Sequence, residues 1–143
     1  MELIKKALQM GKSLLIFLLL AFFISTLSNA QNADGRIIPE SADQLQNPYI
    51  GDKKKMMQGA RIYQKVCWVC HGDAGKGDGP QSLELRNKPA DFNTQLVLGR
   101  SDGALFWWIS NGGNDMQPFR ELLSEEDRWK VVNYVRQLQN KWQ

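Results

Sequence analysis

The sequence predicts an all-α domain, and three observations lead to that class. Residues 124–142 have apolar side chains at helical spacing, a capping serine at the start and three acidic residues in the first turn. Residues 52–66 show a second run of apolar residues at helical spacing. No stretch alternates apolar and polar residues in the way that predicts a β-strand. We therefore expect helices joined by loops.

The first thirty residues predict an export signal. A lysine-containing head leads into the apolar run of residues 14–24, and the small residues Ser28 and Ala30 follow it. The run is shorter than the about 20 apolar residues that a bilayer requires. We therefore expect cleavage after Ala30, with an uncleaved anchor as the alternative. The mature protein would be periplasmic, or held at the outer face of the cytoplasmic membrane if residues 1–30 are retained.

Removal of residues 1–30 changes the charge balance. The full chain has 18 basic and 15 acidic residues, a net charge of +3, and the signal segment holds three lysines and one glutamate. The mature chain therefore has 15 basic and 14 acidic residues, a net charge of +1. Because the basic and acidic residues nearly balance, the chain does not suggest the basic stripe of a nucleic-acid-binding protein. We therefore expect no nucleic-acid partner.

The mature chain divides into an arm and a domain. Residues 31–51 are polar, contain two prolines and show no periodicity, so we expect an extended arm or linker. The domain, residues 52–143, opens with the helix 52–66, for which Asp52 is the N-cap. Gly59 is costly inside a helix, which indicates that another backbone approaches it closely.

The rest of the domain is predicted as alternating loops and helices. A glycine-rich loop (72–80), a short helical turn (81–86) and a further turn (87–92) come first. Residues 101–113 predict a helix that begins at Ser101 or Asp102 and is ended by Asn111 and two glycines. A loop (114–119) then leads to the helix 124–142.

All the thiol and imidazole groups of the chain lie within five residues, as Cys67, Cys70 and His71. Zinc normally takes four ligands, and the chain has no second Cys/His pair. A thioredoxin-type redox pair needs a βαβ context, and a disulfide across so short a loop would be strained and remove little loop entropy. The remaining interpretation is covalent haem attachment, in which Cys-x-x-Cys supplies two thioether bonds and the next histidine ligates the iron.

The single histidine limits what lies on the other side of the iron. A second histidine ligand is impossible within one chain, so the sixth ligand is a methionine, a lysine, a terminal amine, water or nothing. Met56 and Met57 precede Cys67 on its own helix, where packing explains them. Met116 lies 45 positions beyond His71 in a glycine-rich loop and suits a ligand held by a turn, although it could also fill a gap in the core.

From about residue 55 to residue 138 the sequence resembles the class I mono-haem c-type cytochromes. The similar segments are "GARIYQKVCWVCHGDAGKGDGP" and "SEEDRWKVVNYVRQL". The resemblance implies a small cytochrome c-like helical domain around one covalently bound haem c. It also implies that the two helices cross at a glycine and aromatic contact, namely Gly59 and Tyr63 against Val131, Tyr134 and Val135.

The resemblance also assigns roles to the haem-binding residues. Cys67 and Cys70 would form the thioethers, and His71 and Met116 would be the axial ligands. The carbonyl of Pro80 would accept a hydrogen bond from the Nδ1 of His71, and Pro89 is a rival for that role.

Three aromatic residues complete the expected cofactor site. Trp107 and Trp108 occupy the region before the distal loop, where an indole N–H can reach a haem propionate; core packing is the alternative for either. Phe119 keeps the spacing of the family's Met-Pro-x-Phe loop, although here the proline of "MQPF" stands one place later.

The resemblance implies a one-electron carrier of a bacterial-type respiratory chain rather than an enzyme. A quinol-oxidising complex or a dehydrogenase would be the donor, and a terminal oxidase or reductase the acceptor. Alternatives are a fixed haem subunit of a larger respiratory or dehydrogenase complex, which could also hold the protein at a membrane, and an open-site haem sensor or enzyme. The lysines at 53–55 are either a solvated helix end or part of a cationic rim that docks an acidic partner.

Overall fold

The computed structural model describes residues 38–140, together with Glu2. These residues are helical and include no strand; Gly113 and Met116 form only an isolated bridge. The expected all-α class is confirmed. In chain order the helices are α2 (Glu40–Asp43), α3 (Lys53–Val66), α4 (Trp68–His71), the 3-10 helix η1 (Ser82–Glu84), α5 (Gln95–Leu98), α6 (Asp102–Asn111) and α7 (Glu125–Asn140).

The expected signal segment, residues 1–30, lies outside the described residues except for Glu2, as do residues 31–37 and 141–143. Among the residues that are described, no helix is long and apolar enough to cross a membrane.

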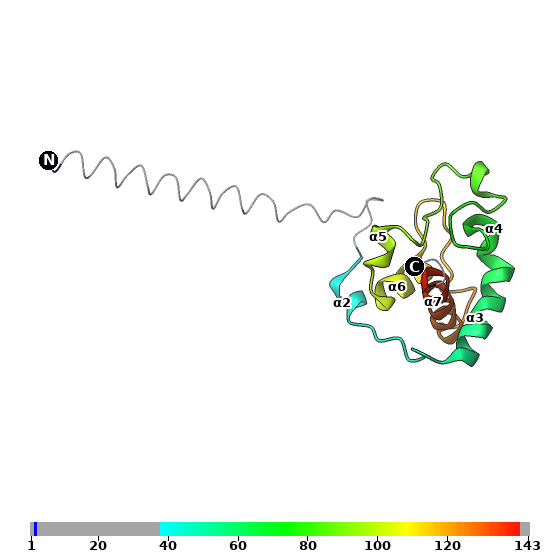
Figure 1. The fold of residues 1–143 in the computed structure, drawn as a ribbon, viewed down its shortest axis with the longest axis horizontal. Helices are drawn as coiled ribbons and strands as arrows, with labels where there is room; N and C mark the ends of the chain where they lie inside the picture. Colours follow the sequence, from blue (N-terminus) through cyan, green and yellow to red (C-terminus); the bar gives the residue numbers. More distant parts are fainter. Residues whose placement is uncertain (1, 3–37, 141–143) are drawn as a thin grey trace. The chain divides into compact units, whose positions relative to one another are not determined.

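Helices α3 and α7 form the central contact of the domain (Figure 1). The side chain of Asp52 caps α3 by accepting a hydrogen bond from the backbone N–H of Lys55 at 3.0 Å, and Ser124 caps α7 in the same way. A Cβ atom placed on Gly59 would lie 1.9 Å from the backbone oxygen of Lys130. Only glycine therefore allows α3 to approach the backbone of α7 this closely.

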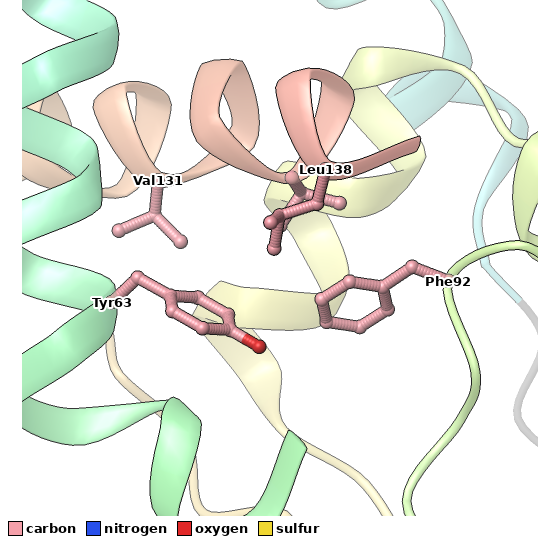
Figure 2. Packing of buried hydrophobic residues seen from close by; sticks show 5 residues of the cluster. Tyr63, Phe92, Val131 and Leu138 are labelled. Carbon is pink, nitrogen blue, oxygen red and sulfur yellow. The ribbon is translucent and has the colours of Figure 1, made fainter. Parts of the chain in front are cut away.

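The buried core lies along this crossing (Figure 2). Tyr63 of α3, Val131 and Leu138 of α7, and Phe92 from the loop before α5 point toward one another. Tyr63 packs edge-on against Phe92, with ring centroids 6.4 Å apart. Contacts between residues far apart in the sequence thus join α3, α7 and the loop before α5.

Part of the segment expected to be an extended arm is instead packed on the domain. Residues 40–43 form α2, and a Cβ atom on Gly103 of α6 would lie 1.8 Å from the carbonyl oxygen of Ala42. Asn47 is buried and donates to Asp102 at 2.9 Å and to Asn133 at 2.8 Å. The polar composition of the segment did not reveal this packing, because the side chain of Asn47 is bonded to α6 and α7 rather than to water. The compact unit therefore begins at Ile38.

The helix expected over residues 101–113 is α6, which ends at Asn111, before Gly112 (φ +64°). Ser101 is its N-cap, because the Ser101 hydroxyl accepts a hydrogen bond from the backbone N–H of Ala104 at 3.0 Å. The turn expected over 81–86 is the shorter helix η1. Helix α5 was not expected from the sequence, since its four residues are too few to show a period.

Candidate cofactor site

The two thiols and the imidazole are arranged by the junction between α3 and α4. Cys67 ends α3 by donating its N–H to the carbonyl of Tyr63 at 2.8 Å, and its own carbonyl accepts from the N–H groups of Cys70 (3.2 Å) and His71 (3.0 Å). Residues three apart in such a turn lie on one face. Both cysteines are free and half-buried.

Burial favours the protonated form of both thiols. Burial, followed by the neighbouring Cys70, raises the pKa of Cys67 to about 12, and burial also raises the pKa of Cys70. Redox-active and metal-binding cysteines have the opposite environment, in which nearby positive charge stabilises the thiolate. No group of three or more His, Cys, Asp or Glu residues that could hold a metal ion occurs in the described part of the chain.

The imidazole of His71 is neutral and largely enclosed. Burial lowers the pKa of His71, while a hydrogen-bonding contact with the backbone of Ala90 acts in the opposite direction. Its Nδ1 is buried and makes no well-formed hydrogen bond. A neutral imidazole is the form that ligates a metal.

The hydrogen bond expected from His71 Nδ1 to the Pro80 carbonyl is not formed. The segment around Pro80 instead runs beside the motif, where Gly79 and Gln81 donate their N–H groups to the carbonyls of Cys70 and Val69. These two bonds fix the path of the backbone at Pro80. The backbone near the imidazole is that of Ala90, directly after the rival Pro89.

The glycine-rich loop 72–80 is fixed beneath the motif. The hydroxyl of Tyr63 donates to the carbonyl of Gly72 at 2.6 Å, and the N–H of Gly77 donates to the carbonyl of His71 at 3.0 Å. Gly72 and Gly77 have φ values of +74° and +69°, which favour glycine. The loop therefore holds the backbone on both sides of the imidazole.

Helix α6 presents unusual apolar surface. Five consecutive apolar residues (105–109), which point in all directions around the helix, are all only half-buried. A helix that is apolar on every side is normally buried, so part of this surface is suited to a further apolar group. Trp107 and Trp108 belong to this run, with ring centroids 6.0 Å apart. Both side chains thus remain available to line a cofactor, as the sequence analysis expected, although no contact of either indole N–H decides between them.

Met116 lies in a tight turn after α6. Gly113 and Met116 exchange two backbone hydrogen bonds of 2.9 and 2.8 Å, and Asn114 between them has φ +52°. A Cβ atom on Gly112 would lie 2.4 Å from the carbonyl oxygen of Met116. Asp115 fastens the turn from outside, because its carboxylate accepts from the backbone N–H of Asn87 at 2.7 Å. Met116 is half-buried and its backbone is firmly held.

Phe119 is buried directly after this turn and donates its backbone N–H to the carbonyl of Ile109 at 3.0 Å. It anchors the distal loop to the end of α6. The shift of the proline noted in the sequence does not disturb this anchor, since Pro118 is exposed.

Sequence analysis missed two residues of the site, Phe92 and Asp115. The ring of Phe92 lies against the imidazole of His71 at a centroid distance of 4.8 Å, but the sequence showed it only as the end of a turn. Asp115 contacts a residue 28 positions away. The sequence offered one signal for each: Phe92 is an aromatic residue at the end of a polar turn, and Asp115 is an acidic residue next to the candidate ligand Met116.

The residues present fit a covalently bound haem. Two free thiols lie one helical turn apart, a largely buried imidazole adjoins them, and α6 offers apolar surface that the polypeptide only half covers. The first two features suit thioether attachment and iron ligation, and the third suits an apolar porphyrin.

Comparison with known proteins identifies the class. Residues 54–135 match the family described as "Cytochrome C oxidase, cbb3-type, subunit III". The match covers more than half of the chain, so the chain belongs to this family of c-type cytochrome domains. A search of the curated proteins gives no match.

A similar solved structure is the "Kuenenia stuttgartiensis reducing HAO-like protein complex Kustc0457/Kustc0458". The matched chain shares 34% sequence identity with this one, at a TM-score of 0.56. The match covers 60% of this chain and 44% of that chain, so this chain spans less than half of its length. The family match makes this a c-type cytochrome domain, with haem c bound covalently.

Proposed function

We propose that the protein is a one-electron carrier of a bacterial-type respiratory chain, with one haem c held by Cys67 and Cys70 and ligated by His71 and Met116. The observation that carries this proposal is the single helical turn that presents both free thiols beside a buried imidazole. When bound, haem supplies a reversible change of iron charge by one electron. The protein supplies ligands, excludes water and offers a docking face.

The chain's own residues favour a carrier over an enzyme. Phe92 and Tyr63 shield the His71 side from water, and the turn at Met116 holds a thioether ready on a rigid backbone. With both axial positions filled by protein side chains, no coordination position is open to oxygen or peroxide. A thioether ligand in an apolar pocket stabilises ferrous iron and raises the reduction potential.

The partners we propose are redox proteins outside the cytoplasm. Export through residues 1–30 would place the domain in the periplasm, or at the outer face of the membrane if that segment is retained. A quinol-oxidising complex or a dehydrogenase would reduce it, and a terminal oxidase or reductase would oxidise it. Of the lysines at 53–55, Lys55 pairs with Glu126 at 2.5 Å, so its charge is used inside the domain rather than on a cationic rim.

A specific observation favours a second candidate, a fixed haem subunit of a larger complex. The family is described as a subunit, and the similar solved chain comes from a protein complex. Extraction with mild detergent separates the two possibilities. A soluble carrier would elute alone, whereas a subunit would co-purify in a stable hetero-complex.

The proposed ligation is tested with carbon monoxide, which binds ferrous haem only where a coordination position is free. The reduced wild-type protein should bind it slowly and weakly, whereas Met116→Ala should bind it readily. Met57→Ala is the matched control, because Met57 is an exposed methionine on α3 and its loss should change nothing. Ready binding by the wild-type protein, unchanged in Met116→Ala, would show an open-site haem protein and contradict the proposal.

A further inference from the structure

The turn of residues 113–116, which bears Met116, is bonded to a second loop of the candidate site. The carboxylate of Asp115 accepts a hydrogen bond from the backbone N–H of Asn87 at 2.7 Å and a longer one from the Asn87 side-chain amide at 3.3 Å. Hydrogen bonds in which one partner is charged are stronger than those between neutral groups. We call these two bonds the clasp.

The loop that carries Asn87 also contacts the imidazole. The backbone of Ala90, three residues further along, is in hydrogen-bonding contact with His71. The ring of Phe92 lies against the same imidazole at a centroid distance of 4.8 Å. The segment 87–92 therefore contacts His71 near one end and the Met116 turn at the other.

This segment is held by the glycine-rich loop and so gives the clasp a firm support. The N–H of Phe92 donates to the carbonyl of Gly75 at 2.8 Å. A Cβ atom on Gly77 would lie 2.1 Å from the carbonyl oxygen of Pro89, so the two backbones are in direct contact there. Asn87 thus belongs to a loop whose position is fixed from the side of the haem-binding motif.

The other bonds of the turn have a different effect. The two backbone hydrogen bonds between Gly113 and Met116 fix the shape of the turn, and the bond from Phe119 to Ile109 fixes its exit against α6. These bonds join the turn to its near neighbours in the chain. The clasp joins it to the segment that contacts the imidazole, and so relates the position of one proposed axial ligand to that of the other.

The clasp lies at the surface, since Asp115 and Asn87 are both exposed, whereas Met116 is half-buried. Much of the cost of a lost hydrogen bond comes from leaving a buried polar group unpaired. Loss of the clasp would expose its polar groups to water instead. It should therefore loosen the turn without unfolding the core.

We propose that Asp115 is a positioning residue, which holds the Met116 turn against the loop that contacts His71 and thereby keeps the Met116 thioether on the haem iron. This inference rests on the proposed axial ligation by His71 and Met116. The strength of the clasp then determines how readily another ligand displaces the methionine.

Imidazole binding to the ferric, haem-loaded protein tests the proposal at constant pH. Added imidazole competes with Met116, and its binding is followed by the loss of the weak far-red absorption that reports the iron–sulfur bond. Asp115→Ala should bind imidazole about fivefold more tightly than the wild type, the ratio that corresponds to one lost hydrogen bond. Asp115→Asn keeps an oxygen that can accept from the N–H of Asn87, so its affinity should lie between the two. The matched control is Glu84→Ala, which removes an exposed carboxylate from η1 and should leave the affinity unchanged.

An unchanged imidazole affinity in Asp115→Ala would overturn the proposal. An equal increase in Glu84→Ala would also overturn it, because the loss of any nearby carboxylate would then be sufficient. Guanidinium unfolding of the same proteins separates positioning from a general structural role. We expect Asp115→Ala to unfold at nearly the same denaturant concentration as the wild type, and a loss of global stability that accounts for the change in affinity would contradict positioning.

Failure of the proposed ligation would give a different result. If Met116 is not a ligand, the wild-type protein lacks the far-red absorption, and Met116→Ala binds imidazole with the wild-type affinity. That outcome would contradict the proposed function itself, whereas a normal far-red absorption with no effect of Asp115→Ala contradicts only the role of the clasp.

Discussion

Replacing Gly59 by alanine tests the crossing of α3 and α7, because two effects of opposite sign compete. Alanine is the better helix former by about 1 kcal/mol, so an uncrowded helix would gain stability. In this structure the new Cβ would lie 1.9 Å from the backbone oxygen of Lys130, whereas ordinary contact begins at 3.4 Å. The helices would have to separate by about 1.5 Å.

The cost of that separation outweighs the gain. A gap of even about 0.5–1 Å removes a quarter to a half of the dispersion energy between packed atoms. Overpacking of a core costs about 1–3 kcal/mol, and a rigid backbone oxygen places this site at the upper end. After the gain in helix propensity, Gly59→Ala should lower the free energy of unfolding by about 2 kcal/mol, or the melting temperature by about 10 °C.

Guanidinium unfolding of the ferric holoprotein measures this difference, followed by circular dichroism and by tryptophan fluorescence. Gly99→Ala is the matched control, since Gly99 is exposed and a Cβ there approaches only the oxygen of Gln95, at 3.2 Å. Its stability should change by less than about 0.5 kcal/mol. A Gly59→Ala protein as stable as the wild type, or more stable, would refute the close approach of the two helices.

Two further predictions concern stability. Tyr63→Phe removes the hydroxyl that donates to the carbonyl of Gly72, so it should lower the free energy of unfolding by about 1–2 kcal/mol in the same assay. The control Tyr134→Phe, at a half-buried position, should cost less. An equal loss in the two variants would argue against the hydrogen bond. Hydrogen bonds from Lys55, the larger cause, and from Lys130 lower the pKa of Glu126 from 4.5 to about 2. Because the pKa of Glu126 is lower in the folded state, its ionised carboxylate stabilises the fold above about pH 4.5. This stabilisation is lost as the pH falls toward about 2. A Glu126→Gln variant should therefore differ slightly from the wild type at neutral pH and converge with it below about pH 2 in an acid-unfolding titration; a difference that persists there would contradict the assignment.

The local features of the fold were predictable from the sequence, and the long-range features were not. Capping residues and apolar spacing predicted α3 and α7 because both signals are contained in a few consecutive residues. The polar contacts that dock residues 38–51 could not be predicted, because they depend on pairs such as Asn47 with Asn133, which are 86 positions apart. A polar side chain looks the same in the sequence whether water or a distant amide satisfies it.

The candidate site also has a part that the sequence predicts and a part that depends on long-range contacts. Cys67, Cys70 and His71 lie within five consecutive residues, and their spacing alone predicts haem attachment. Phe92 was not predicted as a neighbour of His71 because the fold of the glycine-rich loop brings the two rings together. The contact of the imidazole with the backbone of Ala90 is likewise a property of the folded loop, which the prolines in the sequence do not reveal.

The central claim is that one haem is bound covalently through the two thiols of this chain. The most direct test is the mass of the intact, denatured protein, produced in cells that contain c-type cytochrome maturation machinery. We predict a mass that exceeds that of the polypeptide by one haem. The added mass should be retained in acidic organic solvent and lost when Cys67 and Cys70 are both replaced by alanine. A wild-type mass equal to that of the bare polypeptide would contradict the account.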